Sequence, residues 1–426
     1  MPLILITSTT NNTTYVFDKL DKGFCLCPTF VNFSKMKSKK NILLLCVVIL
    51  VGCSTENVTL NEICENSAEI ITIPDEFDIC EPMENLVDDL SFITLETTPE
   101  SVLGEIQKVI ATTTHIYVYD YALNFGPAVF DIDGNFVKRL SHGQGPQEIG
   151  VTGNILFDAN SKLLCVYDTG NHKLVKFDKN GDFIDCHYLD YLLCDIVAID
   201  SAMLSIQPSF QNAVGKITII KDDTLNHNVS LWQIGKERFD IFKKNCFQPC
   251  DEGVIINLPY DNNVYFYKDG CMTVKYKIQN KSKVDLDAYE KEWDMLPAIG
   301  NDEYVYAGNC MESSNYLYLK YITMESIGPV SAYIFRNKKT KRMTPRIYKD
   351  NSIVDLITVH GFQRGCSDVF VGVIESSILH NHPKPQYRWD GSNPNNLISD
   401  EDMAKLRAIK PDDNPIIVLF KLKDDI

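Results

Sequence analysis

Four polar side chains in the first half of the chain could converge on one ligand-binding site. Arg139 and His142 fall in one predicted loop, and Asp168 and His172 fall in the next. A guanidinium, two imidazoles and a carboxylate can together hold a sugar, a peptide or an ion. The chain has no Gly-x-Ser-x-Gly elbow and no His-Glu-x-x-His pair, so we assign no catalytic residue. Ordinary solvated loops are the alternative explanation for these four residues.

Other motifs do not predict a metal or a cofactor. Gly143-Gln144-Gly145-Pro146 lacks the Lys-Ser/Thr pair of a phosphate-binding loop, so we expect a tight connection in which Glu148 caps the loop. His380 and His382 could bind a transition metal, but an exposed loop explains their spacing better. The cysteines form no paired Cys-x-x-Cys pattern, which argues against a zinc site.

Cys53 stands at a predicted lipid attachment site. From Met36 the chain has several lysines, then an apolar run from Ile42 to Val51, then Gly52. A positive segment, a short apolar helix and a small residue before a cysteine are typical of a signal peptide, here residues 36–52. Leu50-Val51-Gly52-Cys53 resembles the bacterial lipobox. The alternative, an uncleaved transmembrane anchor, needs about 20 apolar residues, which this run does not provide.

The segments on either side of this leader have different expected roles. Residues 1–35 precede a complete signal peptide, so we expect Met36 to be the true start and residues 1–35 to be a non-native upstream extension. Residues 53–89 are rich in Asn, Glu and Pro and are expected to form a tether. Residues 90–426 change to short runs of β-forming residues, which predict an all-β domain.

A repeated pattern of strands indicates how this domain is built. His115–Asp120 is followed by a second strand and Asp133-Gly134, and Lys162–Asp168 is followed in the same way by Asn180-Gly181. In both units, a strand that ends in Tyr-Asp is followed by a loop and then by a second strand that leads into the motif Phe-Asp-x-x-Gly-x-Phe. Asn-Gly and Asp-Gly pairs supply the positive φ angles of tight hairpins. The spacing of about 40 to 55 residues is typical of the four-stranded blades of a propeller.

Six such units fit the domain, which predicts a six-bladed β-propeller. We expect the strand at Leu90–Leu95 to pair with the last strand, Ile416–Lys421, and so to close the ring and remove an exposed edge. A pair of β-sandwiches is the alternative, but it would not produce the repeated units. The expected blade starts are Ile106, Ile155, Ile196, Cys246, Tyr304 and Ser367.

The sequence resembles the six-bladed β-propeller lipoproteins of Bacteroidetes-type bacteria, which are similar in shape to NHL-repeat propellers. The resemblance covers roughly residues 90–423. It is carried by five segments: Phe92–Thr97, Gly104–Ile106, Val129–Gly134, Gly143–Glu148 and Asn414–Lys423. It implies a propeller fold and a location in the cell envelope, with no settled activity.

The charge and the missing catalytic motifs narrow the function. A formal net charge of -16 argues against nucleic acid, because binding to phosphates depends on Lys and Arg. We therefore expect an envelope-anchored binding or protein-interaction module, held at the outer membrane on its periplasmic or surface face, with a glycan, a peptide or an envelope protein as its partner. The alternative is a glycan- or peptide-directed lyase or hydrolase that uses the central channel. A channel lined by His, Tyr, Arg and carboxylates would favour the enzyme, and an apolar one would favour the module.

Overall fold

The structure is a computed structural model that describes most of the propeller. The ranges described are 9–10, 13–14, 19–20, 23–24, 60–61, 63, 68–73, 83–121, 126–189, 193–199, 202–207, 215–220, 229–234, 245–250, 252–280, 282, 284–285, 288–289, 292–300, 303–325, 328–347, 353–354, 356–366, 368–380, 389 and 391–424. The signal peptide, Cys53 and His382 lie outside these ranges.

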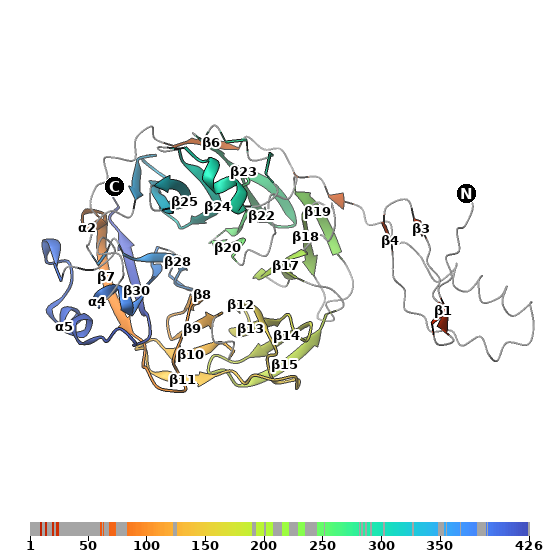
Figure 1. The fold of residues 1–426 in the computed structure, drawn as a ribbon, viewed down its shortest axis with the longest axis horizontal. Helices are drawn as coiled ribbons and strands as arrows, with labels where there is room; N and C mark the ends of the chain where they lie inside the picture. The colour runs from red at the N-terminus through yellow and green to blue at the C-terminus, as the bar shows by residue number, and fades with distance from the viewer. Residues whose placement is uncertain are drawn as a thin grey trace, which may run out of the picture. The chain divides into compact units, whose positions relative to one another are not determined.

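The chain divides into two units, residues 1–57 and residues 58–426. In the first unit the described residues form two small antiparallel pairs. These are β1 (Thr9–Thr10) with β2 (Thr13–Thr14), and β3 (Lys19–Leu20) with β4 (Gly23–Phe24). The second unit contains six sheets of four or five strands arranged in a ring, as Figure 1 shows. This ring confirms the predicted six-bladed propeller.

Each blade begins with an inner strand near the ring axis and continues outward through antiparallel neighbours. The inner strands are β8 (Ile106–Ala111), β12 (Thr152–Asp158), β16 (Asp195–Ile199), β20 (Phe247–Cys250), β24 (Val305–Glu312) and β28 (Thr358–Phe362). The second strands are β9 (His115–Asp120), β13 (Leu163–Asp168), β17 (Ala202–Gln207), β21 (Gly253–Asn257), β25 (Tyr316–Glu325) and β29 (Phe370–Ile374).

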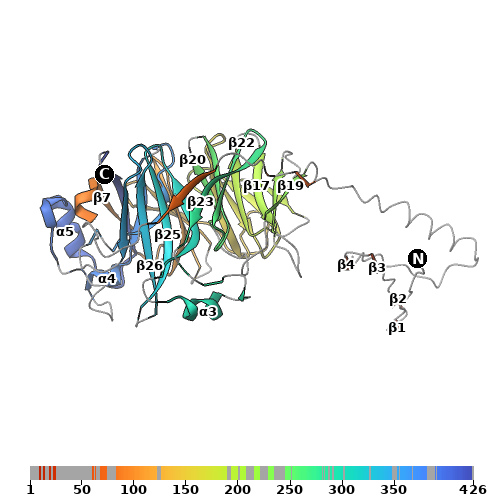
Figure 2. The same ribbon diagram turned by 90° about the horizontal axis from the view of Figure 1, so that it is seen from above.

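The outer half of each blade completes the sheet. The third strands are β10 (Ala128–Asp131), β14 (Lys173–Phe177), β18 (Gly215–Ile220), β22 (Asn263–Lys268), β26 (Gly328–Asn337) and β30 (Ile416–Leu422). The fourth strands are β11 (Phe136–Arg139), β15 (Phe183–Tyr188), β19 (Val229–Ile234), β23 (Cys271–Gln279), β27 (Met343–Ile347) and β7 (Val87–Thr94). Seen from the side in Figure 2, the blades stand next to one another with their strands running between the two faces of the ring.

The sixth blade takes one strand from the beginning of the domain and three from its end. β7 pairs antiparallel with β30, with Ile93 opposite Ile417 and Phe92 opposite Val418. This pairing confirms the predicted ring closure. Five blades begin within three residues of the expected positions, but the sixth begins at Thr358 and not at Ser367. β28 contains a threonine, a histidine and a glycine among its five residues and has a register shift between Val359 and Gly361, so its apolar pattern is weak.

Part of the segment expected as a tether, residues 53–89, is built into the propeller. β5 (Leu60–Asn61) pairs in parallel with β19 at the outer edge of blade 3, and β6 (Glu69–Thr72) pairs in parallel with β23 at the outer edge of blade 4. Ile71 and Ile73 are buried there. The segment continues through α2 (Met83–Leu86) into β7 of blade 6. We call the described residues of this stretch, 60–61, 63, 68–73 and 83–86, the belt, because its strands lie on the outer edges of blades 3 and 4.

The repeated Phe-Asp-x-x-Gly-x-Phe unit has a direct structural explanation. In blade 1, Asp131 Oδ1 accepts hydrogen bonds from the backbone N–H groups of Asp133 and Asn135. Gly134 takes the left-handed conformation at φ +89°, which favours glycine. Phe130 and Phe136 then meet edge to face at 5.7 Å between ring centroids. The second unit forms the same turn, with Gly181 at φ +83° and its two phenylalanines also edge to face.

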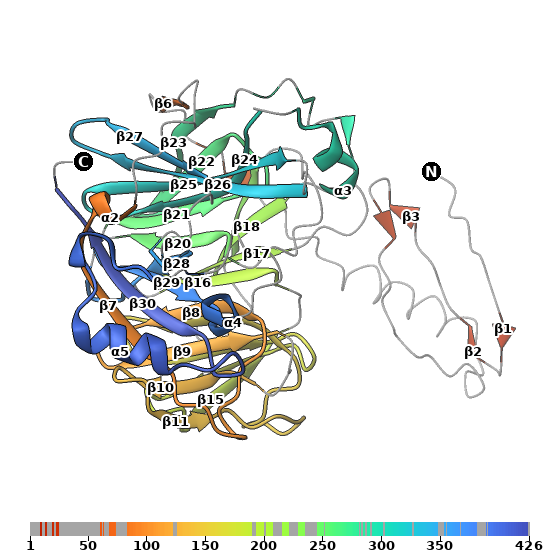
Figure 3. The same cartoon turned by 60° about the vertical axis from the view of Figure 1, so that its left-hand side comes forward.

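Helices are few and lie outside the sheets. The helices α4 (Ser376–His380) and α5 (Asp400–Ala408) lie beside blade 6 near β30, as Figure 3 shows. Within the described part of the chain, no helix has both the length and the apolar character that crossing a bilayer requires. The helices after the belt are α3 (Glu292–Met295), η3 (Leu296–Ala298), α4 (Ser376–His380), η5 (Pro394–Asn396) and α5 (Asp400–Ala408).

Candidate functional site

Three polar side chains on successive inner strands form a hydrogen-bonded chain at the ring centre. Lys108 Nζ of blade 1 donates to Asn154 Oδ1 of blade 2 at 2.9 Å. Asn154 Nδ2 donates to Asp195 Oδ1 of blade 3. Asp195 Oδ2 accepts from the backbone N–H of Phe247 in blade 4 at 3.0 Å. We call Lys108, Asn154 and Asp195 the relay, since together they connect four of the six blades from the inside.

The relay is held in a low-dielectric environment. Asn154 and Asp195 have no exposed surface. Burial raises the pKa of Asp195 above its usual value, although the charge of Lys108 and three backbone N–H groups oppose this. Burial likewise lowers the pKa of Lys108, and the carboxylate of Asp195 opposes that change. Two opposite charges that are joined through an amide can both remain ionised inside a protein, where burying either charge alone would be unfavourable.

Blade 6 brings a second cation to this region. The backbone N–H of Arg364 donates to Ala111 O at the end of β8, at 2.7 Å. Its charge is close enough to Lys108 to contribute to the lowered pKa of the lysine. Burial lowers the pKa of Arg364 itself to about 10. His360, on β28, has a pKa lowered to about 4 by burial and then by the charge of Lys320.

A separate polar contact joins blades 4 and 5. Asn257 accepts a hydrogen bond from Cys310 N at 3.1 Å and donates to Cys310 O at 2.8 Å. The bulge that allows this contact contains Gly308, at φ +69°, where a Cβ atom would lie 1.9 Å from Leu258 O. The inner edge of the ring is therefore joined by buried polar groups in more than one place.

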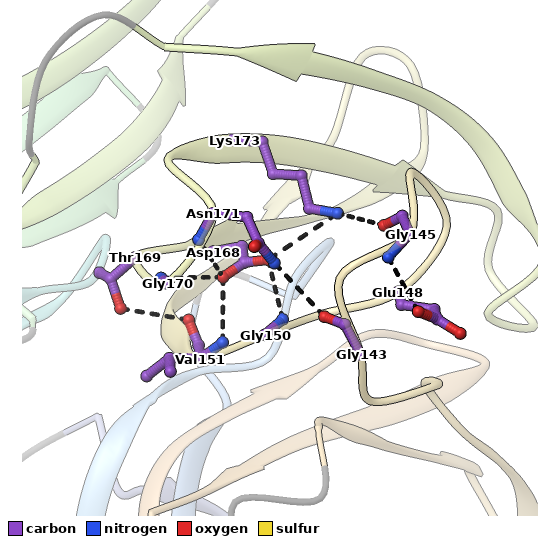
Figure 4. A network of polar contacts seen from close by, with 10 residues as sticks. All are labelled: Gly143, Gly145, Glu148, Gly150, Val151, Asp168, Thr169, Gly170, Asn171 and Lys173. Atoms are coloured by element: carbon purple, nitrogen blue, oxygen red, sulfur yellow. Dashed lines mark hydrogen bonds and ion pairs between the residues drawn. The ribbon is translucent and has the colours of Figure 1, made fainter.

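Asp168, which the sequence predicts as a ligand-binding residue, lies at the centre of a loop network (Figure 4). Its side chain has no exposed surface. Its carboxylate accepts from the backbone N–H groups of Gly150, Val151, Gly170 and Asn171 at 2.8 to 3.1 Å. Burial works to raise its pKa, but these donors outweigh burial and lower the pKa overall. The hydrogen-bonding capacity of the carboxylate is thus used to stabilise the fold.

The glycine-rich loop forms the other half of the network in Figure 4. Lys173 Nζ donates to Gly145 O at 2.5 Å and lies 3.9 Å from Asp168 Oδ2. Glu148 Oε2 accepts from Gly145 N at 2.8 Å, which confirms the predicted capping of this loop. The segment is a connection between blades 1 and 2, as the sequence indicates.

The Tyr-Asp repeat extends this arrangement to blade 1. Asp120 accepts from Gly104 N just before β8, as Asp168 accepts from residues just before β12. The preceding tyrosine reaches the next blade in both cases. Tyr119 donates to Thr152 O at 2.6 Å, and Tyr167 accepts from Leu193 N at 3.0 Å.

The other three predicted site residues lie apart from the relay. Arg139 donates to the backbone carbonyls of Glu100, Gly126 and Val102, so it fastens neighbouring loops. His142 and His172 are exposed, and His172 adopts φ +50°. The structure brings the four together only in the sense that all lie at strand ends or in loops at one end of blades 1 and 2.

The remaining predictions about metal and sulfur chemistry concern other parts of the fold. His380 bonds to the carbonyl of Ile409, whereas His382 lies outside the described residues. No group of three or more His, Cys, Asp or Glu side chains with metal-binding geometry occurs in the described ranges. The free thiols include Cys165, Cys186, Cys250, Cys271, Cys310 and Cys366, of which Cys165 and Cys310 are buried.

Sequence reasoning missed the relay. Lys108, Asn154 and Asp195 each stand near the start of an inner strand, just before an apolar run. Isolated polar residues at equivalent places in successive repeats are the signal that could have identified them, because a buried polar side chain needs a partner.

The ring of six sheets, each built on four antiparallel strands, defines the chain as a six-bladed β-propeller. Residues 69–421 match the family described as "Domain of unknown function (DUF4934)", and the chain belongs to this family. No curated protein is similar to it in sequence. A candidate exported protein from Bacteroides fragilis has a similar structure, with TM-score 0.64, 15% identity, and coverage of 83% of this chain and 99% of the other. A member of the DUF4221 family from Bacteroides vulgatus gives TM-score 0.44 and 10% identity, covering 80% of this chain and 99% of the other.

Proposed function

We propose that this protein is a lipoprotein of the bacterial cell envelope, attached to the outer membrane through Cys53, whose propeller binds a glycan, a peptide or an envelope protein. The observation that carries the binding role is the polar ring centre, where Lys108 lies on the inner strand β8 and Arg364 follows the inner strand β28. Binding sites on rigid elements lose little conformational entropy when a ligand arrives. The similarity to a candidate exported protein supports the envelope location.

The anchor is tested by changing the cysteine and fractionating cells. Cys53→Ala should move the protein from the membrane fraction to the soluble envelope fraction, because a single cysteine carries the proposed lipid. Cys46→Ala, within the leader, is the matched control and should leave the protein in the membrane fraction. Membrane retention of the Cys53→Ala protein would refute the proposed anchor.

The binding role is tested by thermal-shift screening of the purified chain against envelope glycans, peptides and divalent cations. A ligand that binds only the folded state stabilises it by about 2.7 kcal/mol at a hundredfold excess over Kd. A clear increase in Tm with one chemical class would identify the ligand. No increase with any of them would count against a small-ligand site.

An enzyme is the second candidate, because the ring centre contains Lys, Arg, His and a carboxylate and is not apolar. Against it, Asp195 already accepts three hydrogen bonds from neighbouring groups. Incubation with acidic oligosaccharides or peptides, followed by product analysis, separates the two functions. Turnover that Asp195→Asn abolishes while the folded state persists would favour the enzyme.

A further inference from the structure

The ring centre contains two cations whose N–H groups are not all paired with acceptors among the residues that the structure describes. Lys108 has three N–H groups and donates one of them, to Asn154. Arg364 has five N–H donors on its guanidinium. Among the residues that the structure describes, none accepts a hydrogen bond from that guanidinium or from the other two N–H groups of Lys108.

The positive charges of Lys108 and Arg364 are not matched by an equal number of carboxylates whose charge acts on them. Asp195 is the carboxylate whose charge acts on Lys108, and its oxygens are already engaged by Asn154 and by the backbone N–H groups of Ile196 and Phe247. Both cations nevertheless lie where burial disfavours their charge. A cation that burial removes partly from water is stabilised by an anion that pairs with it. This positive centre stands out in a chain whose formal net charge is -16.

From this juxtaposition we infer that the ring centre is an anion-binding site, in which Arg364 and Lys108 together hold a carboxylate or phosphate group of the ligand. The inference rests on the proposed binding role of the propeller and specifies its ligand class. The planar guanidinium pairs with two oxygens of such a group, and the ammonium supplies a point charge beside it.

A neighbouring acceptor adds a second feature to the site. Asn245 donates to Gln107 O, the residue before Lys108, at 3.5 Å. Its own Oδ1 is buried without a partner in the described structure. A ligand hydroxyl close to the anionic group would satisfy this oxygen. An acidic sugar carries both groups, so it is the ligand that this arrangement fits best.

The test compares sugars that differ in the group at C6, which is a carboxylate, a phosphate ester or an uncharged hydroxymethyl group. Glucuronate, glucose 6-phosphate and glucose are titrated into the purified full chain at matched ionic strength, with Tm and calorimetric Kd as readouts. Glucuronate or glucose 6-phosphate should raise Tm, and glucose should not. A response to glucuronate alone assigns a carboxylate ligand, and a response to glucose 6-phosphate alone assigns a phosphate ester.

The variant Arg364→Gln then tests whether Arg364 is the residue that binds the anionic group. It should weaken binding of the anionic sugar at least about tenfold, since a hydrogen bond between charged groups is lost. Arg407→Gln, on the exposed face of α5, is the matched control and should bind as the wild type does. Without ligand, Arg364→Gln should keep or raise Tm, because it removes a buried unpaired charge. A purely structural arginine would instead lower Tm.

Four results would overturn the inference. They are equal effects of glucose and glucuronate, no Tm increase with either anionic sugar, unchanged affinity in Arg364→Gln, or a lower ligand-free Tm in that variant. The proposed function fails separately, when no glycan, peptide or cation of the wider screen binds the wild-type protein. A neutral ligand would therefore leave the binding role in place and remove only the anion site.

Discussion

The carboxylate of Glu69 lies 2.5 Å from the guanidinium of Arg336, a residue 267 positions later in the chain. Glu69 belongs to the belt on blade 4, and Arg336 belongs to β26 of blade 5. Lys341 adds a second cation at 2.9 Å. The belt is therefore fixed to blade 5 by charge as well as to blades 3 and 4 by β-pairing.

Removing this carboxylate should loosen the belt. Glu69→Gln is expected to lower the free energy of unfolding by about 1 to 2 kcal/mol, because Arg336 is only 4% exposed and loses its partner. The hydrogen bond from Arg336 lowers the pKa of Glu69, so this stability is present above about pH 4.3 and is lost as the pH falls through the folded-state pKa. Urea denaturation at pH 7 and at pH 3 measures both effects. Glu401→Gln, exposed on α5, is the control, and an equal effect there would contradict a special role for Glu69.

The relay should behave as one unit. Asn154→Ala separates Lys108 from Asp195 and leaves both buried charges without their shared partner. We expect a loss of about 3 to 5 kcal/mol in the free energy of unfolding. Asn160→Ala, in an exposed turn of the same blade, should change it by less than about 0.5 kcal/mol. Similar values for the two variants, measured by urea denaturation, would show that the relay does not stabilise the ring.

We expect Asp168 to contribute to the stability of the fold rather than to ligand binding. Asp168→Asn replaces one carboxylate oxygen with an N–H group that faces backbone donors, so about 2 to 3 kcal/mol of stability should be lost. Asp182→Asn, on the same blade with 67% of its side chain exposed, is the matched control and should be nearly neutral. Thermal unfolding of both variants measures the difference. If the Asp168→Asn protein is as stable as the wild type, Asp168 is again a candidate ligand-binding residue.

Two glycines with the same backbone conformation should differ in their tolerance of alanine. Gly270, at φ +85°, has open space where a Cβ would lie, so Gly270→Ala should cost about 1 kcal/mol for the left-handed backbone alone. At Gly134, with φ +89°, a Cβ would lie 2.3 Å from Thr94 O. Gly134→Ala should therefore cost at least about 2 kcal/mol more, as the loop after β7 must move. Equal losses in urea denaturation would show that this contact between blades is dispensable.

Local sequence predicted the blade architecture because its signals lie within one repeat. The Asp131 turn and its copy in blade 2 need only neighbouring residues to form, and alternating β-forming residues mark most strands. The pairing of residues 90–95 with 416–421 was also predictable, since an apolar strand at each end of a ring requires a partner.

The belt and the relay depend on contacts that no local pattern encodes. The belt strands β5 and β6 are short, and they form only because the outer strands β19 and β23 offer free edges. Lys108, Asn154 and Asp195 belong to three different blades, and nothing within one strand shows that they meet. The sequence by itself determined the repeat, its turns and the closing strands, because these follow from backbone conformation and apolar patterning. Only the tertiary structure decided which polar side chains are buried together at the ring centre, because burial and pairing arise when all six blades close.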